Sequence, residues 1–224
     1  MRLVYPEMEI DLLIQELEPL ILVVENPIYF TDMTETLWNQ INGQDGKWIL
    51  SDNGKTLKID KKVDFIINPF SVTSNDRKIL NKIYSELNAV ALENYMVELS
   101  RVNAQIISLL DIISQTTPYP MVYNLDMDLT GIFKLYDVKV EEECTSLMEK
   151  LLSYIKLRHQ VTGIDLFVFL NLKQYFSVDQ IELLYEGCRY EQVGLLDIEN
   201  HQYNYRLNSE KYLIIDEDLC IIRI

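Results

Sequence analysis

An α/β fold carrying a helical insertion is predicted by three features of this 224-residue sequence. Residues 20–25 (LILVVE) and 166–171 (LFVFLN) are short, continuous apolar runs, typical of strands buried on both faces of a parallel or mixed sheet. Strand-like and helix-like segments alternate on either side of residues 76–114, which contain no Gly or Pro. We therefore expect an α/β head from residues 1–72 and 118–224, and a protruding helical leg from residues 73–117.

The elements that precede the insertion follow from local signals. Helical spacing of apolar residues covers residues 27–42. Asn53-Gly54 is the strongest short signal for a hairpin turn, and it separates two strand-like runs within residues 48–59. Residues 63–67 form another apolar run and are expected to be a buried strand.

The elements that follow the insertion return to the same alternation. A short helix is expected after Asp128, a strand at residues 138–140, and a helix over residues 146–160 that Gly163 ends. The S-x-x-Q pattern of residues 177–180 is a capping box and begins a helix that reaches about residue 190. Three further apolar runs are expected to be strands: residues 193–198, 212–215 and 219–222.

The apolar residues of the leg change register near residues 92–97, so the leg is either one bent helix or two helices. Ser74 or Asn75 is expected to cap its start. The first stripe comprises Ile79, Leu80, Ile83, Leu87 and Val90, and the second comprises Leu99, Val102, Ile106, Leu109 and Ile113. Self-association would cover these stripes, and the alternative is that a compact body folds around the helix.

Composition indicates a soluble, acidic, globular protein. The chain has 20 Lys and Arg against 35 Asp and Glu, a net charge of −15, and 48% hydrophobic residues, which excludes disorder of the whole chain. Its three cysteines lack CxxC spacing, so we expect neither a disulfide framework nor a zinc site. The first residues do not match a secretory signal, and no run of about 18 residues is sufficiently apolar to span a membrane. We therefore expect a cytoplasmic protein.

Motifs of catalysis are missing from the sequence. Gly54-Lys55-Thr56 resembles the end of a phosphate-binding loop, but Ile49 stands where that loop requires Gly, so we interpret it as a hairpin turn. The two histidines, His159 and His201, have no partner that the spacing would place beside them, and we interpret both as surface residues. We therefore expect that the protein is not an enzyme.

Charged residues offer two further candidate sites. Asp126 and Asp128 could supply oxygen ligands to a hard cation such as calcium, or Asp128 could simply cap the following helix. Positive charge gathers in two clusters, which are Lys55, Lys58, Lys61 and Lys62, and Arg77, Lys78 and Lys82. Each cluster is either a solvated face or a contact for phosphates, and the net charge argues against non-specific coating of DNA.

Five segments, spread from end to end, carry a resemblance to a known family. They are residues 23–30 (VVENPIYF), 75–87 (NDRKILNKIYSEL), 137–141 (DVKVE), 166–185 (LFVFLNLKQYFSVDQIELLY) and 212–216 (YLIID). In their order and spacing the chain resembles the Csn-two family of type II-A CRISPR systems, whose members are accessory proteins of spacer acquisition.

The resemblance implies a homotetrameric ring of α/β heads, similar to a P-loop fold without its phosphate loop, with helical legs that pair. It also implies binding of the ends of linear double-stranded DNA through a basic central hole, calcium binding, and work with the CRISPR integrase and effector nuclease, without enzymatic activity. Contacts with DNA are then expected from Arg77, Lys78, Lys82, Lys55, Lys58, Lys61 and Lys62. The family's acidic, calcium-linked loop is replaced by QTTPYPMVYN at residues 115–124, which leaves chiefly Asp126 and Asp128 as ligands.

Two other functions compete with binding of DNA ends. One is a scaffold of the acquisition complex that does not contact DNA, and the other is a nucleotide-binding protein with a degenerate P-loop. A comparison of linear with closed circular DNA separates the first from DNA-end binding, and a nucleotide titration tests the second.

Overall fold

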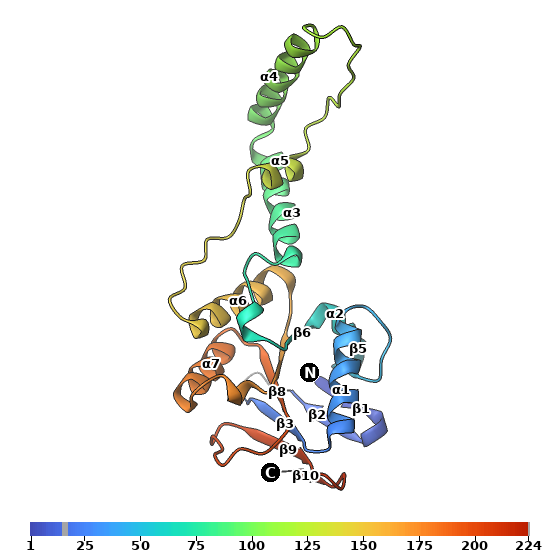
Figure 1. The fold of residues 1–224 in the computed structure, drawn as a ribbon, viewed down its shortest axis with the longest axis vertical. Helices are drawn as coiled ribbons and strands as arrows, with labels where there is room; N and C mark the ends of the chain where they lie inside the picture. Colours follow the sequence, from blue (N-terminus) through green and yellow to red (C-terminus); the bar gives the residue numbers. More distant parts are fainter. Residues whose placement is uncertain (15–17, 224) are drawn as a thin grey trace. The chain divides into compact units, whose positions relative to one another are not determined.

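The computed structural model describes residues 1–14 and 18–223 (Figure 1). The chain divides into two compact units. The first, called the head below, comprises Met1–Ser74 and Glu142–Ile224. The second, called the inserted unit, comprises Asn75–Glu141.

A six-stranded sheet in the order β10-β9-β3-β8-β7-β6 forms the centre of the head. Its strands are β3 (Leu20–Val24), β6 (Val63–Ile66), β7 (Leu166–Leu170), β8 (Gly194–Glu199), β9 (Lys211–Ile215) and β10 (Ile221–Arg223). Neighbouring strands from β9 to β6 pair in parallel, and β10 pairs antiparallel with β9. Every residue of β3 and β8 is buried, which confirms the α/β class and the central position expected for residues 20–25.

A smaller antiparallel sheet in the order β2-β1-β4-β5 lies beside it. Its strands are β1 (Arg2–Tyr5), β2 (Ile10–Leu13), β4 (Ile49–Asp52) and β5 (Lys55–Leu57). The predicted hairpin is confirmed, because Asn53 and Gly54 join β4 to β5 with φ of 48° and 76°. The sequence did not predict β1 and β2, because Pro6, which begins the 3₁₀ turn η1 (Pro6–Met8), interrupts their apolar pattern.

Helices cover both faces of the large sheet, as Figure 1 shows: α6 and α7 lie on one side, and α1 with the smaller sheet on the other. The helices and 3₁₀ turns of the head are α1 (Pro27–Ile41), α2 (Ile59–Lys62), η2 (Pro69–Ser71), α6 (Leu147–Thr162), η3 (Leu172–Gln174) and α7 (Val178–Tyr190). Gly163 ends α6 with φ of 70°, and Ser177 and Gln180 form the predicted capping box of α7. Leu22 and Val24 of β3 share a core with Met33 and Leu37 of α1.

The inserted unit contains α3 (Arg77–Asn94), α4 (Met96–Ser114) and α5 (Leu129–Leu135). The helix is interrupted at Tyr95, where φ is −130° and ψ is 25°, so the predicted change near residues 92–97 separates two helices. Asp76 caps α3, since its carboxylate accepts the Lys78 N–H at 2.8 Å; the prediction of Ser74 or Asn75 as the cap was wrong.

The strand predicted at residues 138–140 is also wrong, for a physical reason. In the described chain this extended segment pairs with no strand, and the side chains of Asn75 and of Tyr84 in α3 bond to its backbone instead. Asn75 donates to the Val140 carbonyl at 3.0 Å and accepts the Val140 N–H at 2.8 Å, while the Tyr84 hydroxyl donates to the Val138 carbonyl at 2.7 Å. The Tyr84 ring also contacts Phe133 of α5, with centroids 5.7 Å apart. These contacts extend the inserted unit to Glu141, beyond the boundary expected at residue 117.

We predict that Tyr84→Phe lowers the stability of the inserted unit by about 1 kcal/mol, because it removes the hydrogen bond to Val138 and keeps the ring contact. Thermal unfolding and amide exchange of residues 137–141 measure the change. Tyr95→Phe is the matched control, since the Tyr95 side chain is exposed and its hydroxyl makes no hydrogen bond within the described residues. Equal stability of the two variants would contradict the assignment.

Candidate nucleic-acid interface

The first two turns of α3 present three cations to solvent. Arg77, Lys78 and Lys82 are all exposed, and none forms an ion pair within residues 1–14 and 18–223. Lys78 and Lys82 are four residues apart and therefore lie on one face of the helix. Among the sequence-predicted DNA contacts, these three are the cations of the inserted unit, and in the described chain their charges are left free for an outside partner, as are those of Lys55 and Lys58 in the head.

The position of these cations at the amino end of α3 destabilises the helix when no anion is bound there. The amino end of a helix carries a partial positive charge, so cations in the first turn are unfavourable by about 0.3–1 kcal/mol. The first turn of α3 contains no acidic residue, although the Asp76 carboxylate caps the helix. A bound anion such as a phosphate would offset this cost, because it interacts favourably with the helix end and with the cations together.

The four predicted lysines of the head differ in whether a carboxylate pairs with them. Lys55 begins β5 and Lys58 precedes α2, and both are exposed. Lys61 is 72% exposed and lies 3.1 Å from the Asp60 carboxylate. Exposed ion pairs of this kind contribute little energy and leave the ammonium accessible.

Lys62 is engaged within the head. Its ammonium lies 2.6 Å from Asp165 and donates to the Gly163 carbonyl at 3.1 Å. His159 is partly exposed and reaches the same loop, with Nδ1 2.6 Å from the Ile164 carbonyl oxygen, a partner that the spacing of the sequence did not reveal. His201 is exposed, as predicted, and stacks on Tyr203.

The two basic clusters belong to different units. Lys55, Lys58, Lys61 and Lys62 lie in the head, and the cations of α3 lie in the inserted unit. Each cluster is therefore a separate candidate surface.

Asp126 and Asp128 lie in the segment that leads into α5. The Asp126 N–H donates to the Asn124 side chain at 3.1 Å, and Asp128 occupies the cap position of α5 without a capping hydrogen bond from its side chain. Within the described residues no group of three or more His, Cys, Asp or Glu could hold a metal ion. Calcium takes six to eight oxygen ligands. The two carboxylates of one chain do not make such a site by themselves.

The carboxyl edge of the large sheet carries a buried polar cluster that sequence reasoning missed. Asp197 and Glu199 of β8 are both fully buried, and burial raises the pKa of each carboxyl. Beside them the Lys173 ammonium lies 2.7 Å from Glu210 and donates to the Tyr212 hydroxyl at 2.7 Å. The available signal was two acidic residues at and just beyond the end of the apolar run 193–198, which was expected to be a strand.

The same edge lacks a phosphate cradle. Glu25 and Asn26 join β3 directly to α1, with Pro27 as the first helical residue and no glycine between. The Asn26 side chain accepts the Ile28 N–H at 3.1 Å, so it occupies the helix end that a phosphate loop would leave open.

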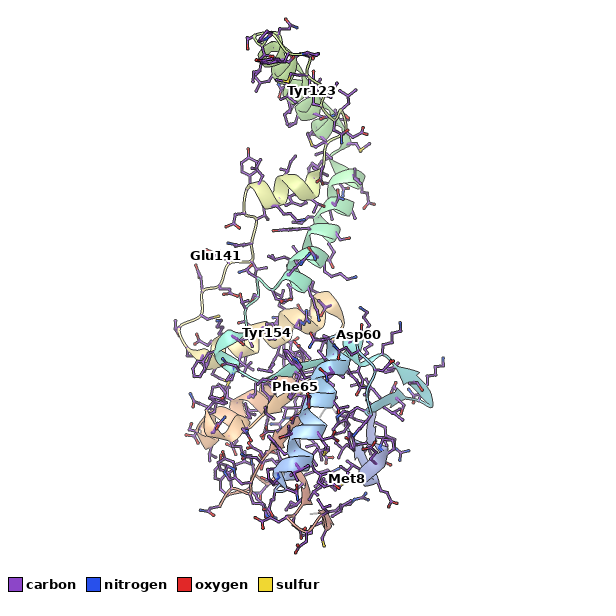
Figure 2. All side chains as sticks on the ribbon, turned by 45° about the vertical axis from the view of Figure 1, so that its right-hand side comes forward. Met8, Asp60, Phe65, Tyr123, Glu141 and Tyr154 are labelled. Carbon is purple, nitrogen blue, oxygen red and sulfur yellow. The ribbon has the colours of Figure 1, made fainter. Side chains whose placement is uncertain are left out.

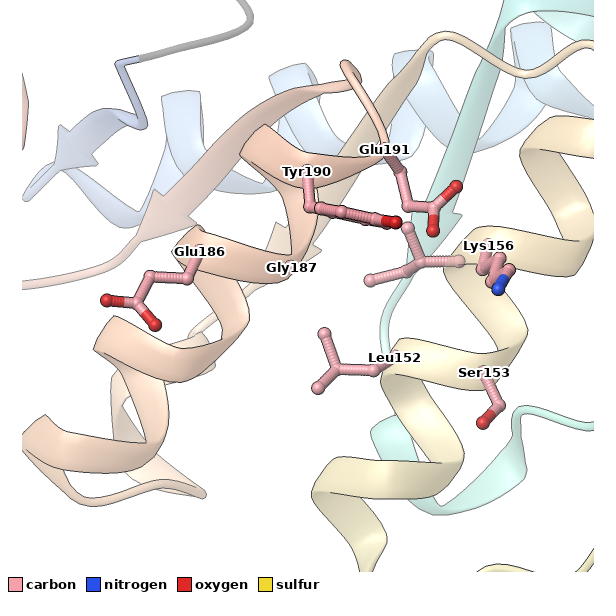
Figure 3. Close-up of a pocket in the computed structure, with 8 residues that line it drawn as sticks. Leu152, Ser153, Lys156, Glu186, Gly187, Tyr190 and Glu191 are labelled. Atoms are coloured by element: carbon pink, nitrogen blue, oxygen red, sulfur yellow. The ribbon is translucent and has the colours of Figure 1, made fainter.

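A groove of about 430 Å³ lies between α6 and α7 (Figure 3). Gly187 allows the helices to approach closely there, since a Cβ would lie 2.3 Å from a methyl of Leu152. Lys156, Glu186 and Glu191 border the groove. It offers room for an apolar group and, among the residues described, no set of metal ligands.

Taken together, the fold and the site define an α/β protein whose parallel sheet joins its first helix without a glycine loop and whose inserted helices display free cations. The chain belongs to the family described as CRISPR-associated protein (Cas_Csn2), whose model matches residues 40–219. Its role is therefore CRISPR-associated. In the described part of the chain, no helix is both long and apolar enough to cross a membrane.

Among solved structures, the chain is similar to a putative ABC transporter ATP-binding protein from Pyrococcus furiosus, with 13% identity and a TM-score of 0.37. The similarity covers 91% of this chain and 88% of the other. Among curated proteins, none matches the chain.

We predict that Lys62→Ala lowers the stability of the head by about 1 kcal/mol, because it leaves Asp165 without its ammonium partner. Lys61→Ala, which removes an exposed charge from the same short helix, should change stability by less than about 0.5 kcal/mol. Chemical denaturation measures both. A destabilisation by Lys61→Ala as large as that by Lys62→Ala would show that the pair with Asp165 has no special structural role.

Proposed function

We propose that this protein forms a homotetrameric ring that binds the ends of linear double-stranded DNA during CRISPR spacer acquisition. The observation that carries the proposal is the set of free, exposed cations on the first two turns of α3, Arg77, Lys78 and Lys82. Membership of the Cas_Csn2 family supports the CRISPR setting. Calcium, the integrase and the effector nuclease are the cofactor and partners that the proposal includes.

Phosphate contact is the mode of binding that these residues favour. Ammonium and guanidinium groups bind phosphate oxygens and fix the position of a protein on the duplex without reading sequence. Asn81 is the amide side chain among them, and no ladder of Asn, Gln or aromatic residues accompanies the three cations for contact with successive base edges. We therefore expect binding that is independent of sequence and strongly dependent on salt.

The net charge of the chain gives the ring its selectivity in this proposal. Four copies carry four times −15, so the exterior of the assembly repels DNA, whereas four copies of one basic cluster can make a positive central hole. DNA would then enter by threading a free end. Closed circular DNA would be excluded.

No chemical step forms part of this proposal. The titratable groups at the carboxyl edge of the sheet are buried and bonded to one another, including Lys173, Glu210 and Tyr212. The direct link of Glu25 and Asn26 between β3 and α1 also argues against the nucleotide-binding alternative. Calcium binding by Asp126 and Asp128 stays a prediction, and it requires ligands from outside this pair.

A scaffold of the acquisition complex that does not touch DNA is the second candidate function. The net charge of −15 favours it, because an acidic surface binds nucleic acid poorly. Measurements of DNA binding separate the two candidates.

We predict that the triple variant Arg77→Ala/Lys78→Ala/Lys82→Ala loses most of its affinity for linear duplex DNA. The slope of log affinity against log salt should become shallower by about 0.9 for each phosphate that the variant no longer neutralises. Fluorescence anisotropy over a range of salt concentrations, with linear, end-blocked and circular DNA, measures both quantities. Wild-type protein should bind free ends only.

The control for this experiment is Lys134→Ala/Lys139→Ala/Lys156→Ala, which removes the same charge from exposed lysines elsewhere. It should keep most of the affinity and the wild-type slope. Wild-type affinity and slope in the α3 variant, with its assembly intact, would shift the DNA-binding surface to Lys55, Lys58 and Lys61. If the wild-type protein does not bind DNA at all, the scaffold function is favoured.

The apolar face of α4 supports the assembly part of the proposal. No residue of α4 is buried within one chain. Val102, Ile106, Leu109 and Ile113 are between 42% and 56% exposed, and they recur at helical spacing along one face. The returning chain contacts the helix only in part: Asn103 donates to the Leu125 carbonyl at 2.8 Å, and the hydroxyl of Tyr123, labelled in Figure 2, donates to Asp111.

We predict that Val102→Asp/Ile106→Asp splits the assembly, since each buried apolar side chain contributes roughly 1.5–3 kcal/mol and a buried carboxylate is strongly unfavourable. Light scattering coupled to size exclusion measures the mass. Ala104→Asp/Ser108→Asp, on the opposite face of α4, is the matched control and should keep the wild-type mass. A wild-type mass for the Val102/Ile106 variant would remove this face from the interface.

A further inference from the structure

Asp197 and Glu199 lie two residues apart on β8, so their side chains point to the same face of the strand. Both residues have no solvent exposure. Two ionised carboxylates at this spacing in the buried interior of the head would repel each other strongly. Some compensating interaction must therefore hold them.

Each carboxylate accepts one backbone hydrogen bond from η3. The Leu172 N–H donates to Oδ1 of Asp197 at 3.2 Å, and the Lys173 N–H donates to Oε1 of Glu199 at 3.0 Å. Asn171, which precedes η3, has φ of 52°, a left-handed conformation that is uncommon for non-glycine residues but that Asn adopts more readily than most. The two carboxylates therefore hold the turn that leads from β7 toward α7.

The second oxygen of each carboxylate is left without a donor in the described chain. Oδ2 of Asp197 and Oε2 of Glu199 are buried, and no donor reaches either of them within the described residues. The two side chains are nevertheless within hydrogen-bonding reach of each other. A hydrogen bond between two carboxyl groups exists only when one of them carries a proton.

The surrounding groups do not supply a substitute for that proton. The neighbouring strands β3 and β7 contain no titratable residue. The ionisable groups that act on the pair come from η3, α7, β9 and the segment before β9: Lys173, Tyr185, His201, Tyr203, Tyr205 and Tyr212. Glu210 acts on the tyrosines among them. Lys173 is the buried cation among them, and its charge is already paired with Glu210 at 2.7 Å.

We propose that Asp197 and Glu199 share one proton and act as a pH-sensitive latch on the turn Leu172–Gln174. With the proton in place, the pair carries a single negative charge and holds the two N–H groups of the turn. Loss of the proton leaves two adjacent buried charges, and their repulsion releases the turn.

The sign of the pH dependence follows from the retained proton. In the unfolded chain both carboxyls are ionised well below neutral pH, whereas the folded head keeps one proton because burial and the partner carboxylate raise the pKa of the pair. The latch therefore contributes full stability at acidic pH and loses it as pH rises toward the pKa of the pair in the folded state. One retained proton makes the unfolding equilibrium constant increase tenfold per pH unit across that interval.

The experiment compares the wild-type protein with Asp197→Asn/Glu199→Gln, in which amides replace both carboxyls and neither side chain titrates. Denaturant unfolding is measured from pH 5 to pH 9. The ratio of the wild-type unfolding constant to that of the variant should increase by up to tenfold per pH unit. Asp218→Asn/Glu182→Gln, which makes the same charge change at exposed positions, should leave this ratio constant.

Two measurements on the wild-type protein need no variant. The infrared spectrum at neutral pH should contain the carbonyl band of a protonated carboxylic acid, and the protection of the Leu172 and Lys173 amides from exchange should fall as the band disappears. A pH-independent ratio would overturn the proposal. If the double variant does not fold, the infrared band decides: its presence together with the fall in protection supports the latch, and its absence overturns it.

Discussion

Burial of both faces of the parallel sheet is the constraint on which the rest of the structure depends. Parallel strands require crossover connections, and β6 and β7 are adjacent parallel strands. The inserted unit, Asn75–Glu141, lies within this one crossover. It therefore lengthens a connection that the sheet needs in any case and leaves the pairing of Val63 with Leu166 intact. Glu142 joins the two ends of the insertion, because it accepts the Thr73 hydroxyl at 3.0 Å and the Ser74 N–H.

The same constraint decides which parts of the fold the sequence could reveal. Strands covered on both faces must be continuously apolar, so β3 and β7 were recognisable from their composition. The hairpin at Asn53-Gly54 and the capping box at Ser177 depend on neighbouring residues and were equally clear. The prediction of a strand at residues 138–140 was wrong because apolar and polar residues alternate there as they do in a strand. The backbone groups of this segment bond instead to the side chains of Asn75 and Tyr84, which are far away in the sequence. Local pattern does not specify a distant partner.

In the candidate site, too, features that depend on neighbouring residues could be predicted, whereas features that depend on distant partners could not. The clustering of cations is visible in the sequence, and it led to the seven Lys and Arg residues that make up the two basic clusters. Their availability is not visible, because it depends on partners that folding brings near: Asp165, 103 residues from Lys62, occupies that ammonium, whereas Arg77, Lys78 and Lys82 stay free. The carboxyl pair of β8 was missed for a related reason, since acidic residues in an apolar run can be buried or can mark a strand end, and only the fold decides.

The head and the inserted unit differ in how far their charged and apolar side chains find partners within the chain. In the head, buried ionisable groups are matched with one another, as Lys173 is with Glu210 and Asp64 is with Arg158, so their charges serve folding. In the inserted unit, α4 buries no residue within one chain and α3 presents cations that no carboxylate of the described chain neutralises. Exposed apolar surface and unpaired charge both lower their free energy by contact with other molecules. The inserted unit therefore presents both unpaired cations and an uncovered apolar face to other molecules, whereas in the described residues of the head Lys55 and Lys58 are the unpaired lysines of the predicted contacts.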